Sequence, residues 1–264
     1  MARFADRERY FEALAETSRT CYRAHIGRYR TLAPGASILE IGCGEGGNLL
    51  PFAEAGYAVT GIDISPNKIR NARAFFDKRG VPGTFEVRNF LDPDDFPDGP
   101  VYDLILIHDV IEHIEPEWKD RFFARLAAFL KPGGLVFWGF PAWYMPFGGH
   151  QQICRSKACR LPFLHLLPRG LYKGYLNVFK EEPETVRDLM SIYRSRMTVE
   201  RFEKLCRTHG LRIEDRVLWL VNPHYKAKFG LKPRRLPRFL AALPGLRDFL
   251  ATSCFYLTSF FDGV

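Results

Sequence analysis

The chain has 264 residues, 47% of them hydrophobic, and its 38 lysine and arginine residues outnumber its 30 acidic residues to give a formal net charge of +8. This length and apolar content suit one α/β domain around a single large core, so a second independent domain is not required. No apolar run approaches the roughly 18 residues that a membrane-spanning helix needs, which excludes such a helix. The positive charge favours an anionic partner (nucleic acid, a membrane surface or an acidic substrate) or simply a basic enzyme.

The six cysteines are scattered along a chain too long to depend on disulfide bonds. No signal peptide precedes the first charged residues, so we expect reduced thiols and a cytoplasmic protein, at most peripheral to the inner face of a membrane. Apolar and aromatic residues at roughly helical spacing over residues 4–30 predict one or two amphipathic helices before the first strand.

Residues 37–50 read Ser-Ile-Leu-Glu-Ile-Gly-Cys-Gly-Glu-Gly-Gly-Asn-Leu-Leu and predict a buried strand, a tight turn with four glycines and the start of a helix. Glycine is needed in such a turn because the backbone takes positive φ and a ligand lies directly against the main chain. The pattern Gly-x-Gly-x-x-Gly from Gly42 fits a dinucleotide-binding fingerprint. The pattern Glu-x-Gly-x-Gly-x-Gly from Glu40 fits the first motif of S-adenosylmethionine-dependent methyltransferases, so the glycines alone leave both alternatives open.

The second predicted strand, residues 58–63, ends on an acid. Asp63 lies about twenty residues after the first glycine, where folds of this kind hold ribose hydroxyls. A carboxylate suits that role because it can accept two hydrogen bonds at once. A helix over residues 66–79 and a third strand over residues 84–88 then lead to Asn89-Phe90.

Three later segments decide between the two alternatives. The first segment, residues 101–107, predicts a fourth strand, and the sequence Asp-Val-Ile-Glu-His-Ile follows it at 109–114. A helix is then predicted from Pro116 to the sequence Lys-Pro-Gly-Gly, and a fifth strand is predicted at 135–140. This succession resembles class I S-adenosylmethionine-dependent methyltransferases in order and spacing over about residues 36–140, and dehydrogenases have no counterpart to it. The resemblance is strongest to small-molecule and quinone O-methyltransferases (the methyltransferase type 11/12 group) whose fourth strand ends in Glu-His.

The resemblance implies a Rossmann-like α/β fold with a seven-stranded, mostly parallel sheet, helices on both faces, an antiparallel last strand and a cap inserted after strand five. We therefore expect one methyltransferase domain over residues 1–264. Its expected parts are an N-terminal helical lid (1–35), a cofactor-binding core (36–140), an acceptor-binding cap (141–196) and the C-terminal half of the sheet (197–264) with a basic and apolar insertion (223–252).

The resemblance also implies S-adenosylmethionine as the cofactor. The predicted cofactor-binding residues are Glu40, Gly42, Cys43, Gly44, Gly46, Asp63, Ile64, Asn89, Phe90 and His108. The family usually carries an aspartate where this chain has Asn89. The amide oxygen of Asn89 can still accept a hydrogen bond from the adenine amino group, and Asp92 is the alternative acceptor for that bond. In the lid, Tyr10, Tyr22 or Arg23 could touch the cofactor, with plain core packing as the alternative.

Methyl transfer from a sulfonium is an in-line displacement, so the remaining task is to deprotonate or orient the acceptor. A histidine that titrates near neutrality is a reasonable base for a phenol hydroxyl, which makes His150 and His113 the catalytic candidates. His150 is preferred because it lies in a polar Gly-Gly-His-Gln-Gln patch of the cap. His113, on the helix predicted after the fourth strand, has a purely structural alternative.

We predict no metal site, although two sets of side chains offer an alternative. Asp109, Glu112 and His113 would share one face of a helix and could hold a divalent cation that lowers the pKa of a catechol. The spacing of His150, Cys154, Cys159 and His165 matches no standard zinc module.

The sequence thus predicts a methyltransferase (EC 2.1.1.-) that acts on a small-molecule or lipid-like acceptor, with a phenol or quinol oxygen as the expected nucleophile. One alternative is an RNA methyltransferase that uses the basic C-terminal segment, although no base-flipping motif or RNA-binding module is present. Another is a non-catalytic S-adenosylmethionine-binding protein. Cations beside apolar residues at 223–250 favour a peripheral membrane contact, with an ordinary surface helix as the alternative. The acceptor and the oligomeric state are left open.

Overall fold

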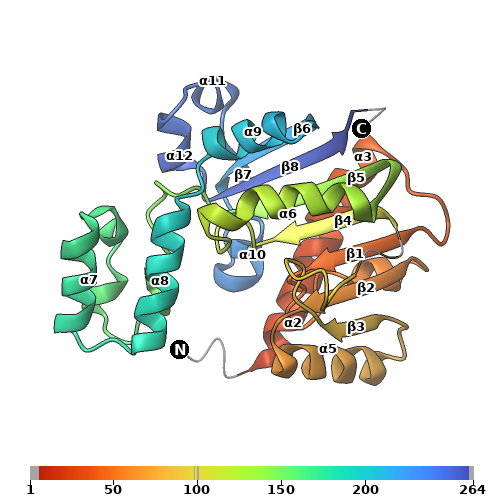
Figure 1. Ribbon diagram of the computed structural model, residues 1–264, viewed down its shortest axis with the longest axis horizontal. Coiled ribbons are helices and arrows are strands. Elements are labelled where there is room, and N and C mark those ends of the chain that lie inside the picture. Colours follow the sequence, from red (N-terminus) through yellow and green to blue (C-terminus); the bar gives the residue numbers. More distant parts are fainter. Residues whose placement is uncertain (1–5, 98, 100, 262–264) are drawn as a thin grey trace.

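The computed structural model describes residues 6–97, 99 and 101–261 and contains one mixed β-sheet in the strand order β3-β2-β1-β4-β5-β8-β6-β7 (Figure 1). The strands are β1 Ser37–Ile41, β2 Ala58–Asp63, β3 Thr84–Val87, β4 Tyr102–His108, β5 Leu130–Phe140, β6 Leu211–Val221, β7 Arg234–Arg235 and β8 Ser253–Phe260. The α/β class and the mostly parallel sheet are confirmed, and β8 runs antiparallel to both β5 and β6 as expected for the last strand. The sheet has eight strands rather than seven because the short β7 pairs with the edge of β6.

The parallel strands end together at one edge of the sheet. Ile41 at the end of β1 lies opposite Ile62 of β2 and Ile107 of β4. Parallel strands place their carboxyl ends at the same edge, so the segments that follow β1, β2 and β4 meet there.

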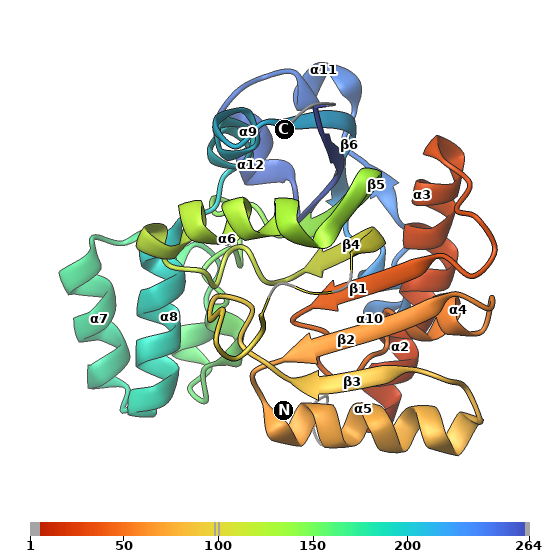
Figure 2. The same ribbon diagram turned by 45° about the vertical axis from the view of Figure 1, so that its right-hand side comes forward.

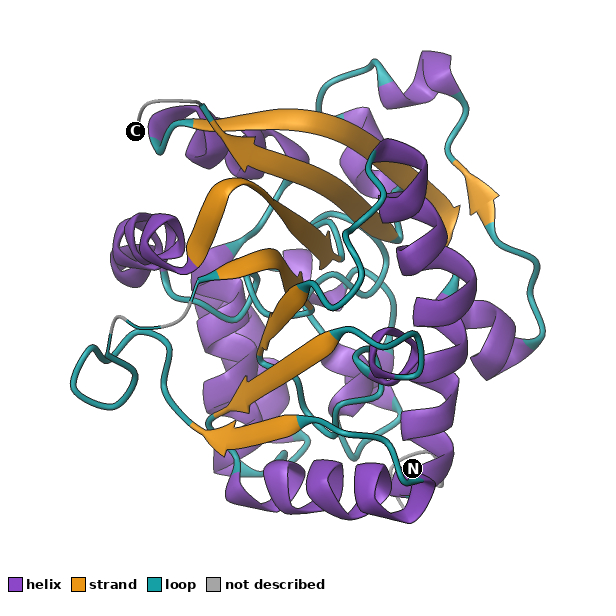
Figure 3. Ribbon diagram, turned by 90° about the vertical axis from the view of Figure 1, so that its right-hand side faces the viewer, coloured by secondary structure: helices purple, strands orange, loops and turns teal. Residues whose placement is uncertain are grey.

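Helices cover both faces of the sheet (Figure 3). On one face, α6 (Pro116–Phe129) and α9 (Val199–Thr208) bury their aromatic side chains in a large core. The other face is covered by α2 (Arg7–Thr17), a π-helical turn (Ser18–Tyr22), α3 (Arg23–Tyr29), α4 (Leu50–Ala53) and α5 (Pro66–Arg79).

Helix α6 and the fifth strand differ in detail from the simplest sequence pattern. Trp118 on α6 is 44% exposed, whereas Phe122 and Leu126 of the same helix are buried. The fifth strand begins at Leu130 rather than at Leu135. It includes the Lys-Pro-Gly-Gly segment because the register with β4 shifts there, from Tyr102 opposite Leu130 to Leu104 opposite Leu135.

The insertion after β5 forms a separate layer beside the carboxyl ends of the strands (Figures 1 and 2). It contains α7 (Arg169–Val178), α8 (Pro183–Ser195) and three short 3-10 turns at Gln151–Ile153, Ala158–Arg160 and Leu164–Leu166. A third hydrophobic cluster, which includes Trp143, Tyr172 and Leu189, holds this layer together. The predicted insertion at 141–196 thus has a small core of its own.

The second insertion consists of short elements. It contains α10 (His224–Phe229), α11 (Arg238–Ala241) and α12 (Leu246–Leu250), and Pro237 and Pro244 lie between these helices, where proline prevents one continuous helix. Across the described residues, every helix is too short or too polar to cross a membrane. Residues 1–5, the first part of the predicted lid, lie outside the described residues, as do Asp98 and Pro100.

Candidate functional site

A cavity of about 550 Å³ lies at the carboxyl edge of the sheet, and we call it the edge cavity. Its lining residues are Ile41, Gly42, Ile62, Asp63, Ile64, Lys68, Arg88, Asn89, Phe90, Leu91, Asp109, Val110, His113, Ile114, Glu115, Trp118, Phe122 and Asp188. Open α/β sheets bind their ligands at this edge. Half of the predicted cofactor-binding residues line the cavity, namely Gly42, Asp63, Ile64, Asn89 and Phe90.

The glycine-rich turn after β1 brings bare backbone to the cavity. Gly42, Gly44 and Gly46 have φ angles of 72°, 56° and 81°, a region that glycine adopts without strain. A Cβ on Gly42 would lie 2.5 Å from Cγ2 of Val110, so this position also needs glycine for space. Gly44 and Gly46 do not line the cavity themselves and contribute by shaping the turn.

Asp63, at the end of β2, is buried and held in place by the backbone around it. Its Oδ2 accepts a hydrogen bond from the Gly44 N–H at 3.0 Å, and its Oδ1 accepts one from the Ser65 N–H at 2.9 Å. Lys68 Nζ lies 3.6 Å from Oδ2. Each carboxylate oxygen keeps acceptor capacity toward the cavity, which is what a pair of ribose hydroxyls requires.

Asn89 and Phe90 follow β3 and form the next part of the cavity wall. Asn89 Oδ1 accepts a hydrogen bond from the Leu91 N–H at 3.0 Å. An amide oxygen has two lone pairs, so one remains for a ligand amino group. Asp92 is not part of the lining; its Oδ1 accepts from the Asp94 N–H at 3.0 Å.

Three predicted cofactor contacts lie behind the cavity wall instead. Cys43 is buried in the hydrophobic cluster that the N-terminal helices cover. Glu40 is also buried, its Oε1 accepts from Asn48 Nδ2 at 2.7 Å, and burial raises the pKa of its carboxyl to about 8. His108 has its Nε2 2.7 Å from the hydroxyl of Tyr22 and its Nδ1 3.4 Å from Oδ2 of Asp109. Of the three, His108 contacts a residue that does line the cavity, Asp109.

The lid residues named from sequence are likewise absent from the cavity lining. Tyr10 packs edge-on against His224 with ring centroids 5.9 Å apart, and Arg23 donates to the carbonyl of Pro51 at 2.8 Å. Tyr22 reaches the site indirectly, through its contact with His108. Tyr10 and Tyr22 thus pack against other side chains of the protein, and Arg23 lies away from the edge cavity.

The segment that follows β4 is a turn and not a helix, which corrects the shared helical face expected for Asp109, Glu112 and His113. Asp109 adopts a left-handed backbone with φ of 53°, and its N–H donates to the Gly139 carbonyl at 2.8 Å. Asp109 and His113 line the edge cavity, whereas Glu112 is buried beneath them. A non-glycine residue held at positive φ is often found at a functional site.

Both catalytic candidates lie in one polar cluster, although they come from different parts of the chain. The rings of His113 and His150 meet edge-on with centroids 4.9 Å apart, and His150 Nε2 lies 3.7 Å from Oε1 of Glu112. Ligand atoms of Glu112, His113 and His150 all lie within 4.8 Å of one another. Both carboxylate oxygens of Glu112 are buried with no hydrogen-bond partner among the described residues.

Burial sets the protonation of this cluster. It lowers the pKa of His150 to about 4, with a contribution from nearby His113, and it raises the pKa of Glu112, with a contribution from Asp109. His150 is therefore a neutral imidazole near pH 7, and its pKa lies below the near-neutral value on which its choice from the sequence was based. When Glu112 and His150 share one proton, the state with a neutral carboxylic acid and a neutral imidazole is favoured over the ion pair.

The cap loop holds His150 in place through close packing. A Cβ on Gly149 would lie 2.2 Å from Cβ of His165, and one on Gly148 would lie 2.2 Å from the Trp143 carbonyl oxygen. His150 itself takes a left-handed backbone with φ of 58°. Both glycines are therefore required for the loop to pass so close to Trp143 and His165 and to place His150 beside His113.

The set His150, Cys154, Cys159 and His165 does not form a metal site. In the part of the chain that the structure describes, the group with metal-site geometry is Glu112, His113 and His150. Cys154 and Cys159 belong to the hydrophobic cluster of the cap, and His165 Nε2 is 2.7 Å from the Trp143 carbonyl oxygen.

Sequence reasoning missed Lys119, which joins the turn after β4 to the cap. Its buried Nζ donates to the carbonyls of Ile111 and Ile114 at 2.7 and 2.6 Å and to Ser195 Oγ at 3.0 Å. A signal was available: Lys119 lies three residues before the buried Phe122, on the core-facing side of α6.

Comparison with known proteins finds similarity to methyltransferases over part of the chain. Residues 38–134 match the family described as "Methyltransferase domain". A ubiquinone biosynthesis O-methyltransferase of Paramagnetospirillum magneticum is 35% identical over 121 residues, which cover 45% of this chain and 46% of that protein. An uncharacterized methyltransferase of Mycobacterium tuberculosis is 33% identical over 118 residues, or 45% and 44% of the two chains. The chain thus spans about half the length of the curated relatives it matches.

Solved structures share the fold over more of the chain. An S-adenosylmethionine-dependent methyltransferase from Clostridium acetobutylicum aligns over 95% of this chain and 92% of its own, with a TM-score of 0.58 and 11% identity. Magnesium protoporphyrin IX methyltransferase from Synechocystis, solved with bound SAH, aligns over 96% and 83% with a TM-score of 0.54 and 15% identity. At such low identity these neighbours establish the fold alone.

Proposed function

We propose that the chain is a class I S-adenosylmethionine-dependent methyltransferase, as its match to the methyltransferase domain over residues 38–134 supports, and that it transfers a methyl group from S-adenosylmethionine to an oxygen of a small or lipid-like acceptor. One observation carries the proposal: two groups of residues line the same cavity. The glycine turn and Asp63 form one group, and the other is His113, whose ring contacts that of His150.

The cofactor half of the proposal rests on the ends of β1, β2 and β3. Gly42 offers backbone with no side chain in the way, Asp63 offers two carboxylate oxygens to a ribose, and Asn89 offers an amide oxygen to an adenine amino group. S-adenosylmethionine supplies the electrophilic methyl group when it is bound. The protein holds the two reactants close together and keeps water out.

The acceptor half rests on His150 as the base. Its neutral imidazole, close to His113 and to the buried Glu112, would accept the proton of an acceptor hydroxyl as the methyl group is transferred. The relatives named as ubiquinone biosynthesis O-methyltransferases support a phenol or quinol oxygen as the nucleophile.

The same cluster supports a second arrangement, in which Glu112, His113 and His150 bind a divalent cation. The buried oxygens of Glu112, which have no hydrogen-bond partner among the described residues, favour this arrangement, and two imidazoles with one carboxylate are a common donor set for such an ion. Such an ion would lower the pKa of an acceptor hydroxyl and take over part of the role given to His150.

A turnover assay tests the proposal. The protein is incubated with S-adenosylmethionine and a panel of phenols, catechols, quinols and bacterial lipid extract, and the release of S-adenosylhomocysteine is measured with EDTA and with added Mg²⁺. Turnover that survives EDTA and is lost in His150→Ala supports the base, and turnover abolished by EDTA supports the cation. No turnover on any acceptor, despite tight cofactor binding, would contradict a catalytic role.

A further inference from the structure

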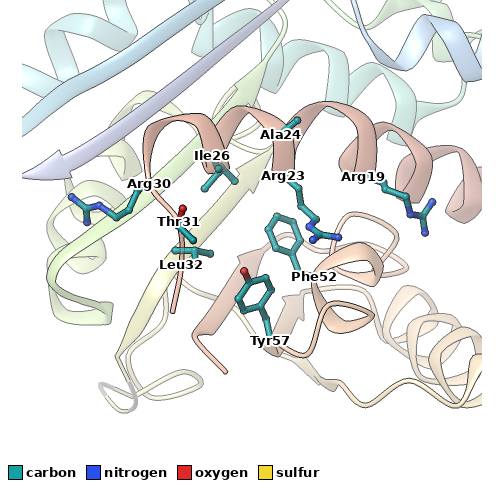
Figure 4. Close-up of a pocket in the computed structure, with 10 residues that line it drawn as sticks. Arg19, Arg23, Ala24, Ile26, Arg30, Thr31, Leu32, Phe52 and Tyr57 are labelled. Atoms are coloured by element: carbon teal, nitrogen blue, oxygen red, sulfur yellow. The ribbon is translucent and has the colours of Figure 1, made fainter. Parts of the chain in front are cut away.

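A second cavity, of about 380 Å³, lies between the N-terminal helical segment and the α4 region (Figure 4). None of its lining residues belongs to the edge cavity. Leu32, before β1, and Tyr57, before β2, place it near the amino edge of the sheet, away from the proposed methyl-transfer site. We call it the arginine pocket.

Residues 19, 23 and 27 form one stripe of the helical segment facing this pocket, and Arg30, which follows the end of α3 with an extended backbone, continues it. Arg19, Arg23 and Arg30 supply three cations at the pocket. Arg19 is paired with carboxylates, because its Nη2 lies 2.7 Å from Glu54 Oε2. Arg23 and Arg30 instead donate to the carbonyls of Pro51 and Gly133, and among the described residues neither has a carboxylate partner. Their positive charge is therefore uncompensated at the pocket.

Gly27 keeps the middle of the stripe open. Glycine inside a helix is less favourable than alanine by about 1 kcal/mol. Packing does not explain the glycine here, because a Cβ at position 27 would meet no atom within 4 Å. A larger side chain would project into the pocket that Gly27 lines.

The wall of the arginine pocket opposite the arginine residues consists of apolar and aromatic side chains and also carries hydroxyl groups. Figure 4 shows Arg23 directed toward the rings of Phe52 and Tyr57, with Thr31 and Leu32 nearby. The guanidinium carbon of Arg23 lies 6.0 Å from the centroid of the Phe52 ring. Phe52 and Leu32 suit an apolar group, whereas Arg23 and the hydroxyls of Tyr57 and Thr31 suit an anion.

We propose that the arginine pocket binds a phosphate monoester that carries a small apolar or aromatic group. Arginine pairs with phosphate through parallel N–H donors, and a volume of about 380 Å³ leaves room for a group attached to the phosphate. The same chemistry occurs in a free organic phosphate and in a lipid headgroup. The proposal is independent of the proposed function, since it uses neither the edge cavity nor the polar cluster.

Phenyl phosphate is the probe for the free ligand, measured by calorimetry and by ligand-observed NMR on the full chain. Arg23→Gln removes the central cation, and Gly27→Leu fills the pocket while leaving every charge in place. Arg28→Gln is the matched control, because Arg28 is exposed on the same helix and does not line the pocket. Flotation with phosphatidylcholine vesicles, with and without phosphatidic acid, tests the headgroup.

We expect phenyl phosphate to bind wild type and Arg28→Gln equally, to bind Arg23→Gln at least about tenfold more weakly, and not to bind Gly27→Leu. The same pattern seen only with phosphatidic acid vesicles would assign the pocket to a lipid headgroup. Two results overturn the proposal: no binding of either probe by the folded wild type, or an equal loss of binding in Arg28→Gln. Circular dichroism of each variant establishes that it is folded.

Discussion

Lys119→Met should remove a pH dependence of stability that the buried amine creates. Burial lowers the pKa of Lys119 from 10.5 to about 7, so between pH 7 and about 10.5 the unfolded chain binds a proton that the folded chain does not. Stability therefore rises with pH across this window. One pKa unit corresponds to 1.36 kcal/mol, and Lys119 is half protonated in the folded state at pH 7, so its contribution from pH 7 to 9 is about 2 kcal/mol.

Urea unfolding followed by circular dichroism at pH 7 and pH 9 measures this contribution. The free energy of unfolding should rise by about 2 kcal/mol more in wild type than in Lys119→Met over the two pH units. Lys204→Met, at an exposed position on α9, is the control and should behave as wild type does. An identical pH dependence in wild type and Lys119→Met would refute the assignment of a buried amine beneath the turn that carries Glu112.

Three further substitutions test the site. His150→Ala should lower turnover by roughly two to four decades with unchanged S-adenosylmethionine affinity; a loss of only a few-fold, measured by steady-state kinetics, would move the role of base to His113. Asp63→Ala should weaken cofactor binding by about 1–3 kcal/mol by calorimetry, and it should also lower stability because the Gly44 and Ser65 N–H groups lose their acceptor; unchanged affinity would remove Asp63 from the cofactor site. Gly149→Ala should lower the melting temperature and turnover together, because its Cβ would overlap His165; a fully active, equally stable variant would contradict the packing described for the cap loop.

The parallel half of the sheet could be predicted closely because its signals are local. β1 begins at Ser37, where the predicted strand begins, β2 has the predicted bounds, and α5 begins at Pro66 and ends before Gly80, which takes a left-handed φ of 62°. Proline at a helix start and glycine after its end act through their own backbone. β7 was missed because it is a two-residue pairing specified by the neighbouring strand, with no apolar pattern of its own.

The candidate site was predicted less completely, because burial decides which side chains reach the cavity. Glu40 and His108 lie within the motif as expected, yet their side chains contact Asn48 and Tyr22 behind the cavity wall. His113 and His150 were treated as alternatives, and their contact depends on how the cap folds over the turn. Sequence spacing does not encode such a contact between segments 37 residues apart. It also predicted a helix at Asp109, where the structure has a turn.

The contacts proposed for the 223–250 segment stay a prediction. Its apolar side chains include Phe229 and Phe239, which are 58% and 70% exposed, beside several lysine and arginine residues. Exposed apolar groups beside cations are typical of a surface that meets an anionic bilayer.

The most direct test of the account is a calorimetric titration of the purified protein with S-adenosylmethionine and, separately, with NADH. A site built from the glycine turn, Asp63 and Asn89 predicts micromolar affinity for S-adenosylmethionine, weakened in Asp63→Ala, and no heat with NADH. Binding of NADH without binding of S-adenosylmethionine would contradict the account, because the glycine turn would then serve a dinucleotide.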